Sequence, residues 1–325
     1  MKTRALKILS ILTVLLLQTA CNTPVPSDPE LASIDDRNLP SSDLSIKIPG
    51  LSPCTTKTDT TLHLNSNEPV NIIVHGCFGS AALFRSLAQV FAFHGQQTIC
   101  FNYNDRDSMM KSTAELVSAL NLLSAKMNNR HLTVIGHSQG GLIARKALTQ
   151  EREDNLQIND ASLDLVTISS PYAGIAAADH CASTTMRYLT LGLVIPICKI
   201  ISGDKWYEIT HPSPFIQEPG ILLEQVTSHL KIVTNETGSC RQYDDKGVCL
   251  EDDFVFSTTE QYFRQVDAPA RVDNIEVLAG HAEIVGDYRV PPTKLIKLLQ
   301  LKGIMRDTPP AQHEQLSLLL ARLYQ

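Results

Sequence analysis

Residues 132–148 constrain the fold of this 325-residue chain more than any other stretch. An apolar, β-prone run at 132–135 is followed by the Gly-His-Ser-Gln-Gly motif at 136–140, and then by a segment with helical periodicity. This order predicts a strand, a sharp turn and a helix. Such a turn holds its serine in a strained conformation, and the glycines let strand and helix pass closely. Ser138 is therefore a candidate nucleophile, and a glycine-rich packing turn is the alternative.

Apolar runs alternate with helix-like segments along most of the chain. Strands are predicted at 70–75, 98–103, 132–135, 163–169, 230–234 and 274–279. Helices are predicted at 81–93, 108–127, 141–148, 291–301 and 311–324. This alternation favours an α/β fold with a doubly wound, mostly parallel sheet. The pattern breaks at 172–222, which predicts a helical cap or lid insertion over the carboxyl edge, where open α/β sheets bind ligands.

The first 53 residues lack the alternation of apolar runs and helix-like segments that marks the rest of the chain. A positively charged start and an apolar stretch at 8–17, too short to span a bilayer, predict an export signal peptide at 1–20. Cys21 follows a small residue, which resembles a lipobox and implies lipidation of that cysteine; secretion after a different cut is the alternative. Six prolines among polar residues at 21–53 predict a tether, so the folded domain is expected at 54–325. We therefore expect an exported bacterial lipoprotein, anchored by lipid in the cell envelope at the outer membrane or periplasm, or a secreted protein.

Charge and cysteine content narrow the possible partners. A formal net charge of -6 leaves no basic surplus for a polyanion, so we expect no nucleic-acid partner. Eight cysteines in an exported chain predict disulfides. Sequence does not fix their pairing, but we favour Cys240 with Cys249 and Cys181 with Cys198, with Cys54 and Cys100 as a third candidate pair. The cysteine and histidine spacings of structural zinc sites do not occur, so we predict no metal.

A serine hydroxyl needs a base within hydrogen-bond reach and a carboxylate that orients this base. His281 directly follows a predicted strand in a Gly-His loop, and is the candidate base. The acid is expected after the strand that ends near residue 234 and before His281. Asp252 and Asp253 both meet this condition. His137, beside the serine, is expected to be a packing residue.

Attack of serine on an acyl carbonyl places negative charge on oxygen, which backbone N–H donors must stabilise. One donor is predicted at Gln139, directly after the nucleophile. The second is predicted at Cys77, in the glycine loop at 75–79, with Phe78 as the alternative. The glycines of this loop permit a close backbone approach; the alternative is a tight turn without a catalytic role.

These motifs together resemble the α/β-hydrolase superfamily, and within it the bacterial lipases and the PGAP1-like lipase and esterase group. The resemblance covers residues 70–300 and rests on five segments: 75–79, 136–141, 169–174, Asp252 three residues ahead of Val255, and Gly280-His281. Lipases commonly have Thr-Pro-His-x-Gly in the third segment, from which Tyr172 departs.

The resemblance implies the α/β-hydrolase fold and a Ser138, Asp252 and His281 triad, with Asp253 as the alternative acid. It implies a serine carboxylester hydrolase, a lipase or esterase, that acts on an acyl ester or lipid through an acyl-enzyme without a cofactor. The alternatives are an acyltransferase or a peptidase that uses the same residues, and a non-catalytic binding lipoprotein.

Overall fold

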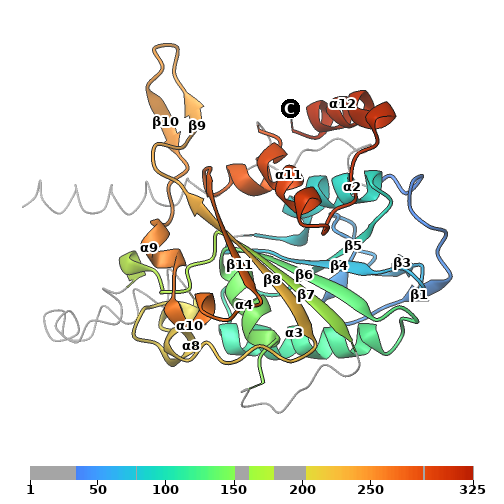
Figure 1. The fold of residues 1–325 in the computed structure, drawn as a ribbon, viewed down its shortest axis with the longest axis horizontal. Coiled ribbons are helices and arrows are strands. Elements are labelled where there is room, and N and C mark those ends of the chain that lie inside the picture. The colour runs from blue at the N-terminus through green and yellow to red at the C-terminus, as the bar shows by residue number, and fades with distance from the viewer. Residues whose placement is uncertain (1–33, 78, 151–160, 179–202, 288–289, 325) are drawn as a thin grey trace, which may run out of the picture.

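The structure is a computed structural model that describes residues 34–77, 79–150, 161–178, 203–287 and 290–324. A seven-stranded sheet in the order β11-β8-β7-β6-β4-β5-β2 forms its centre (Figure 1). The six predicted strands are β4 (Val70–Val74), β5 (Gln97–Phe101), β6 (His131–His137), β7 (Ser162–Ile168), β8 (Val226–Asn235) and β11 (Val272–Leu278). Every pairing among them is parallel, and β2 (Leu51–Ser52) pairs antiparallel with β5. The mostly parallel sheet predicted from the apolar runs is thereby confirmed.

Helices cover both faces of the sheet. On one face lie α2 (Arg85–Phe93), α11 (Thr293–Leu301) and α12 (His313–Leu323), and on the other α3 (Met109–Ser124) and α4 (Gln139–Ala147) (Figure 1). The side chain of Ser108 caps α3 by accepting the Lys111 N–H, and the apolar stripe of this helix is buried. Two hydrophobic clusters result, one on each side of the sheet. The sheet is therefore doubly wound. Because its six long strands are parallel, their carboxyl ends lie along one edge.

The folded domain begins earlier than the sequence predicts. We expected a tether as far as residue 53, but β1 (Leu44–Ile46) pairs with β3 (Leu62–Leu64), and β2 joins the central sheet. Leu51 is 1% exposed, and a disulfide between Cys54 and Cys100 joins this segment to β5. The boundary is corrected because β2 is buried at the edge of the central sheet and β1 pairs with β3, although both strands lie in a proline-rich stretch. The predicted signal peptide at 1–20 and Cys21 lie outside the described residues.

A hairpin of β9 (Cys240–Tyr243) and β10 (Cys249–Asp252) projects away from the sheet (Figure 1). A disulfide joins Cys240 and Cys249, as predicted, and the two strands that carry these cysteines pair antiparallel. After the hairpin come two short helices, α9 (Thr258–Gln261) and α10 (Arg264–Asp267).

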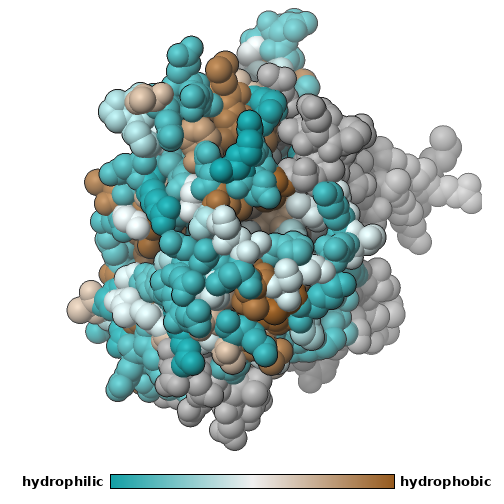
Figure 2. Space-filling model, turned by 90° about the vertical axis from the view of Figure 1, so that its right-hand side faces the viewer, coloured by the Kyte–Doolittle hydropathy of each residue, from teal (hydrophilic) through white to brown (hydrophobic). Residues whose placement is uncertain are grey.

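Parts of the predicted cap at 172–222 are described. They are η3 (Ala176–Ala178), η4 (Asp204–Trp206) and α8 (Pro214–Gln217). The remaining short 3-10 helices are η2 (Ala81–Phe84), η5 (Glu283–Val285) and η6 (Pro310–Gln312). Cys181 and Cys198, the other predicted disulfide, lie outside the described residues. Figure 2 shows one face of the molecule, on which hydrophilic residues predominate and apolar residues gather in small patches. Within the described residues, no helix has both the length and the apolar character needed to cross a bilayer.

Candidate active site

Ser138 lies in a strained turn at the carboxyl edge of the sheet. It separates β6 from α4 and has φ 56° and ψ −127°, a left-handed conformation that is costly for a residue with a side chain. Its N–H donates to the carbonyl oxygen of Ile168 at 2.9 Å. A Cβ atom at Gly140 would lie 2.2 Å from the backbone oxygen of Val74, so only glycine permits this approach of helix to strand. The structure thus contains the sharp turn that the sequence predicts.

The glycine loop after β4 lies directly against Ser138. A Cβ atom at Gly76 would lie 2.8 Å from Ser138 Cβ and 3.4 Å from Ser138 Oγ. Cys77 follows in this loop and is partly exposed, whereas Gln139 is 1% exposed at the start of α4. Both predicted oxyanion donors are therefore on segments that border the serine. Phe78, the alternative donor, lies outside the described residues.

His281 follows β11, and its backbone is held from two sides. Its N–H donates to the carbonyl oxygen of Asp253 at 3.0 Å, and its own carbonyl oxygen accepts a hydrogen bond from His137 Nε2 at 3.0 Å. The rings of His137 and His281 lie 4.7 Å apart. Because His137 immediately precedes Ser138, these contacts place the loop of His281 beside the serine turn.

His137 is more than a space-filling residue. It packs against Phe84 and His281, and burial, followed by the neighbouring charge of His281, lowers the pKa of His137 to about 3. The imidazole of His137 is therefore neutral at physiological pH, and its Nε2–H anchors the carbonyl of His281. A neutral neighbour also avoids a second positive charge beside His281.

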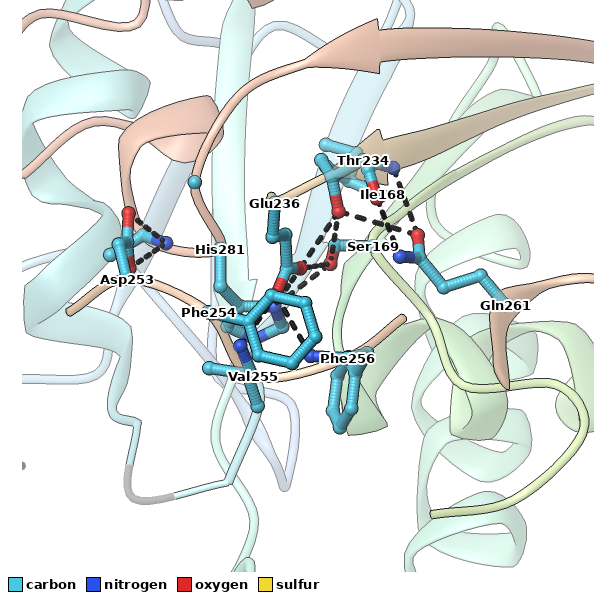
Figure 3. A network of polar contacts seen from close by, with 12 residues as sticks. Ile168, Ser169, Thr234, Glu236, Asp253, Phe254, Val255, Phe256, Gln261 and His281 are labelled. Carbon is cyan, nitrogen blue, oxygen red and sulfur yellow. Dashed lines mark hydrogen bonds and ion pairs between the residues drawn. The ribbon is translucent and has the colours of Figure 1, made fainter. Parts of the chain in front are cut away.

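The carboxylate that contacts His281 is Glu236 (Figure 3). Glu236 Oε1 lies 3.0 Å from His281 Nδ1, and Glu236 Oε2 accepts the backbone N–H groups of Val255 and Phe256 at 2.6 and 2.8 Å. Glu236 is 1% exposed. Burial alone would raise the pKa of Glu236, but the hydrogen bond and charge of His281 and the two backbone donors lower it to about 2. Glu236 is thus a buried, ionised acceptor that directs the Nδ1–H of His281 toward itself.

This geometry corrects the predicted acid. Asp252 ends the projecting hairpin, is exposed, and accepts the backbone N–H of Phe254. Asp253 is buried, but its carboxylate accepts the backbone N–H groups of Ala282 and Glu283 rather than the imidazole (Figure 3). Burial raises the pKa of Asp253, which these hydrogen bonds only partly offset. Asp253 therefore shapes the turn after His281, and Asp252 does not reach it.

The sequence contained a signal for Glu236. The acid was expected after the strand that ends near residue 234, and Glu236 is the first carboxylate beyond that strand. Its longer side chain spans the distance from the end of β8 to His281. Its position directly after the strand thus makes Glu236 one of the candidate acids in the sequence, whereas the expected spacing to Val255 selected Asp252.

Sequence reasoning also missed Lys205, which lies within the predicted cap segment and is 2% exposed. Its ammonium group donates to Gln139 Oε1 at 2.5 Å and to Cys77 Sγ at 3.0 Å, and lies 3.7 Å from Asp105 Oδ2. Lys205 thus connects the cap to both residues that carry the predicted oxyanion donors. Within the part of the chain that the structure describes, no cluster of three His, Cys, Asp or Glu side chains has a geometry suited to a metal ion.

Comparisons with known proteins agree with this fold. A sequence model of the family described as palmitoyl protein thioesterase matches residues 69–218, which include the glycine loop and Ser138. None of the curated proteins matches the sequence.

Among solved structures, the propeptide form of a Bacillus licheniformis lipase is similar at 14% identity and a TM-score of 0.50, over 79% of this chain and 53% of the lipase chain. The mature form of that lipase has 15% identity and a TM-score of 0.48, over 75% of this chain and 94% of its own. An inhibited esterase B from Lactobacillus rhamnosis has 14% identity and a TM-score of 0.48, over 91% of this chain and 95% of its own. At 14% identity, the similarity with a TM-score of 0.50 concerns the fold alone.

Proposed function

Because the chain has the α/β-hydrolase fold, we propose that this protein is a serine hydrolase that cleaves acyl esters through an acyl-enzyme. The observation that carries the proposal is the hydrogen bond between His281 Nδ1 and the buried carboxylate of Glu236, beside the strained turn of Ser138. A buried ionised acid, an imidazole and a serine hydroxyl at one sheet edge are the groups that nucleophilic acyl transfer needs.

The roles follow from this geometry. Glu236 fixes the tautomer of His281 with a proton on Nδ1, which leaves Nε2 to accept the hydroxyl proton as Ser138 attacks the acyl carbon. Glu236 then stabilises the imidazolium, which returns the proton to the leaving group. The backbone N–H groups of Gln139 and Cys77 stabilise the oxyanion. Water, activated by His281, finally releases the acid from Ser138.

The leaving group defines a second candidate function. Lipase-like and esterase-like relatives favour oxygen esters, whereas the family model that covers Ser138 favours acyl thioesters. The same nucleophile, base and oxyanion donors serve both, because the two substrates differ only in the departing atom. We place oxygen esters first and long-chain thioesters second.

The test compares the purified protein with Ser138→Ala. We expect the wild type to hydrolyse p-nitrophenyl esters, tested from butyrate to palmitate, and to be labelled at Ser138 by a fluorophosphonate probe. Ser138→Ala should lose both properties while keeping its circular dichroism spectrum. Turnover unchanged by this substitution, or absence of labelling, would refute the proposal. S-acyl N-acetylcysteamine substrates with matched acyl chains then decide between ester and thioester.

We further propose that the chain is exported and anchored by a lipid on Cys21, at the end of a tether that is shorter than its sequence predicts. The two described disulfides, Cys54–Cys100 and Cys240–Cys249, support an oxidising compartment. Mass spectrometry of protein from a bacterial host should show a diacylglycerol-modified Cys21, and Cys21→Ala should move the protein from the membrane to the soluble fraction. An intact N-terminal peptide in the mature protein would contradict export.

A further inference from the structure

Ser169, outside the predicted catalytic set, has an unusual backbone. It directly follows β7 and has φ 47°, and among the described residues Ser138 is the only other non-glycine residue with positive φ. Glycine adopts this conformation at no steric cost, whereas a residue with a Cβ atom is strained. The strain is maintained by a backbone hydrogen bond from Ser169 N to Ile232 O at 2.9 Å. A side chain retained where glycine would be relaxed indicates a use for that side chain.

The hydroxyl of Ser169 lies between the proposed acid and base (Figure 3). Ser169 Oγ is 2.8 Å from Glu236 Oε1 and 2.8 Å from His281 Nδ1, and it accepts a hydrogen bond from Thr234 Oγ1 at 2.7 Å. Ser169 itself is 0% exposed. With Glu236 ionised, the serine hydroxyl donates to the carboxylate, and its two lone pairs face Thr234 Oγ1 and the Nδ1–H of His281. Thr234 Oγ1 also lies 2.9 Å from Glu236 Oε1, so its proton has a second acceptor in the same network.

We propose that Ser169 is a positioning residue of the reaction, which holds the imidazole of His281 and the carboxylate of Glu236 in one fixed arrangement. The inference rests on the proposed function. As His281 becomes an imidazolium, its Nδ1–H has two acceptors, Glu236 Oε1 and Ser169 Oγ, so the charge is shared by a second oxygen. The same hydroxyl stops the carboxylate from rotating away from the ring. The backbone strain at Ser169 maintains this geometry.

The left-handed backbone makes a sharp experiment possible. Ser169→Ala removes the hydroxyl and keeps the strain, whereas Ser169→Gly removes both. We expect both variants to lose kcat by about 10- to 100-fold on p-nitrophenyl butyrate with KM unchanged, as for one hydrogen bond to a charged group. The Tm of the glycine variant should exceed that of the alanine variant by about 2–4 °C because its backbone is relaxed.

Ser170→Ala is the matched control, because its hydroxyl bonds only weakly to the carbonyl of Ile168, at 3.3 Å, and should keep kcat within about twofold. A kcat within twofold of wild type in both Ser169 variants, while Ser138→Ala is inactive, would refute the role of Ser169 and leave the proposed function standing. Full activity of Ser138→Ala would instead refute the function itself. A loss of kcat in Ser169→Ala that Ser169→Gly restores would show that backbone geometry, not the hydroxyl, matters.

Discussion

Replacing Glu236 by glutamine is the most direct test of the acid assignment. The substitution keeps the size of the side chain but removes its charge, and it places an amide among groups that all donate hydrogen bonds. The pKa of Glu236, about 2 against an ordinary 4.5, corresponds to about 3 kcal/mol of interaction with the ionised form. Loss of the orienting carboxylate in a serine hydrolase lowers kcat by roughly 10⁴-fold, because the imidazole adopts the wrong tautomer.

The effect of Glu236→Gln on the free energy of unfolding should depend on pH. Because folding lowers the pKa of Glu236, its stabilisation is fully present above about pH 4.5 and is lost as the pH falls toward about 2. Glu236→Gln should therefore be less stable than wild type by up to about 3 kcal/mol at pH 7. This difference should shrink between about pH 4.5 and pH 2, as the carboxylate of the wild type becomes protonated.

The assays are steady-state kinetics with p-nitrophenyl butyrate and urea unfolding at a series of pH values. Asp252→Asn provides the matched control, since this exposed carboxylate accepts only a local backbone N–H, and it should keep kcat within about twofold. The kcat of Asp253→Asn should lie between those of Asp252→Asn and Glu236→Gln, because this substitution loosens the turn after His281. A larger loss in Asp252→Asn than in Glu236→Gln would overturn the reasoning from geometry.

Three further predictions concern the surroundings of the site. Gly76→Ala should lower kcat at least tenfold, because its Cβ atom would lie 2.8 Å from that of the nucleophile; unchanged ester turnover would show that the loop moves aside. Burial lowers the pKa of His137 from 6.5 to about 3, so the unfolded chain binds a proton that the folded chain excludes, and stability should fall as the pH drops below 6.5. His137→Gln should flatten that decline in urea unfolding, and an unchanged slope would contradict a buried neutral ring. Replacing Cys54 and Cys100 by alanine should lower the free energy of unfolding by about 4 kcal/mol, and removing the hairpin disulfide should lower it by about 3 kcal/mol. The first disulfide costs more to lose because it closes a loop of 46 residues, whereas the second closes one of 9. The reverse order in chemical unfolding would exclude loop closure as the main contribution.

The sequence predicted those features whose cause is local. Continuous apolar runs identify the parallel strands because these are buried on both faces, and the strand, turn and helix around Ser138 follow from glycine spacing. The position of β2 was not predictable in this way. It is two residues long, and its place depends on pairing with β5 and on the disulfide to Cys100.

The identity of the catalytic acid was likewise not predictable from local sequence pattern. Several carboxylates lie between β8 and His281, and pattern alone does not say which of them folds inward. Glu236 is selected by the N–H groups of Val255 and Phe256, which return to it from beyond the hairpin. Ser169 begins one of the segments that carry the family resemblance, but its role gave no sequence signal, because a left-handed serine is indistinguishable in sequence from an ordinary one.

A hydrogen bond between Glu236 and Val255 joins the two segments that flank the β9–β10 hairpin, and this limits how far changes in the hairpin affect the site. The chain leaves at Glu236 and returns at Val255, where the two segments are bonded to each other. The base of the projection is also held to the domain, because Arg241 donates to Asp287 and Asp253 accepts from the turn after His281. The length and sequence of the tip between β9 and β10 can therefore change without displacing the acid. That projection is the natural place to graft a new recognition element or an affinity tag onto the molecule.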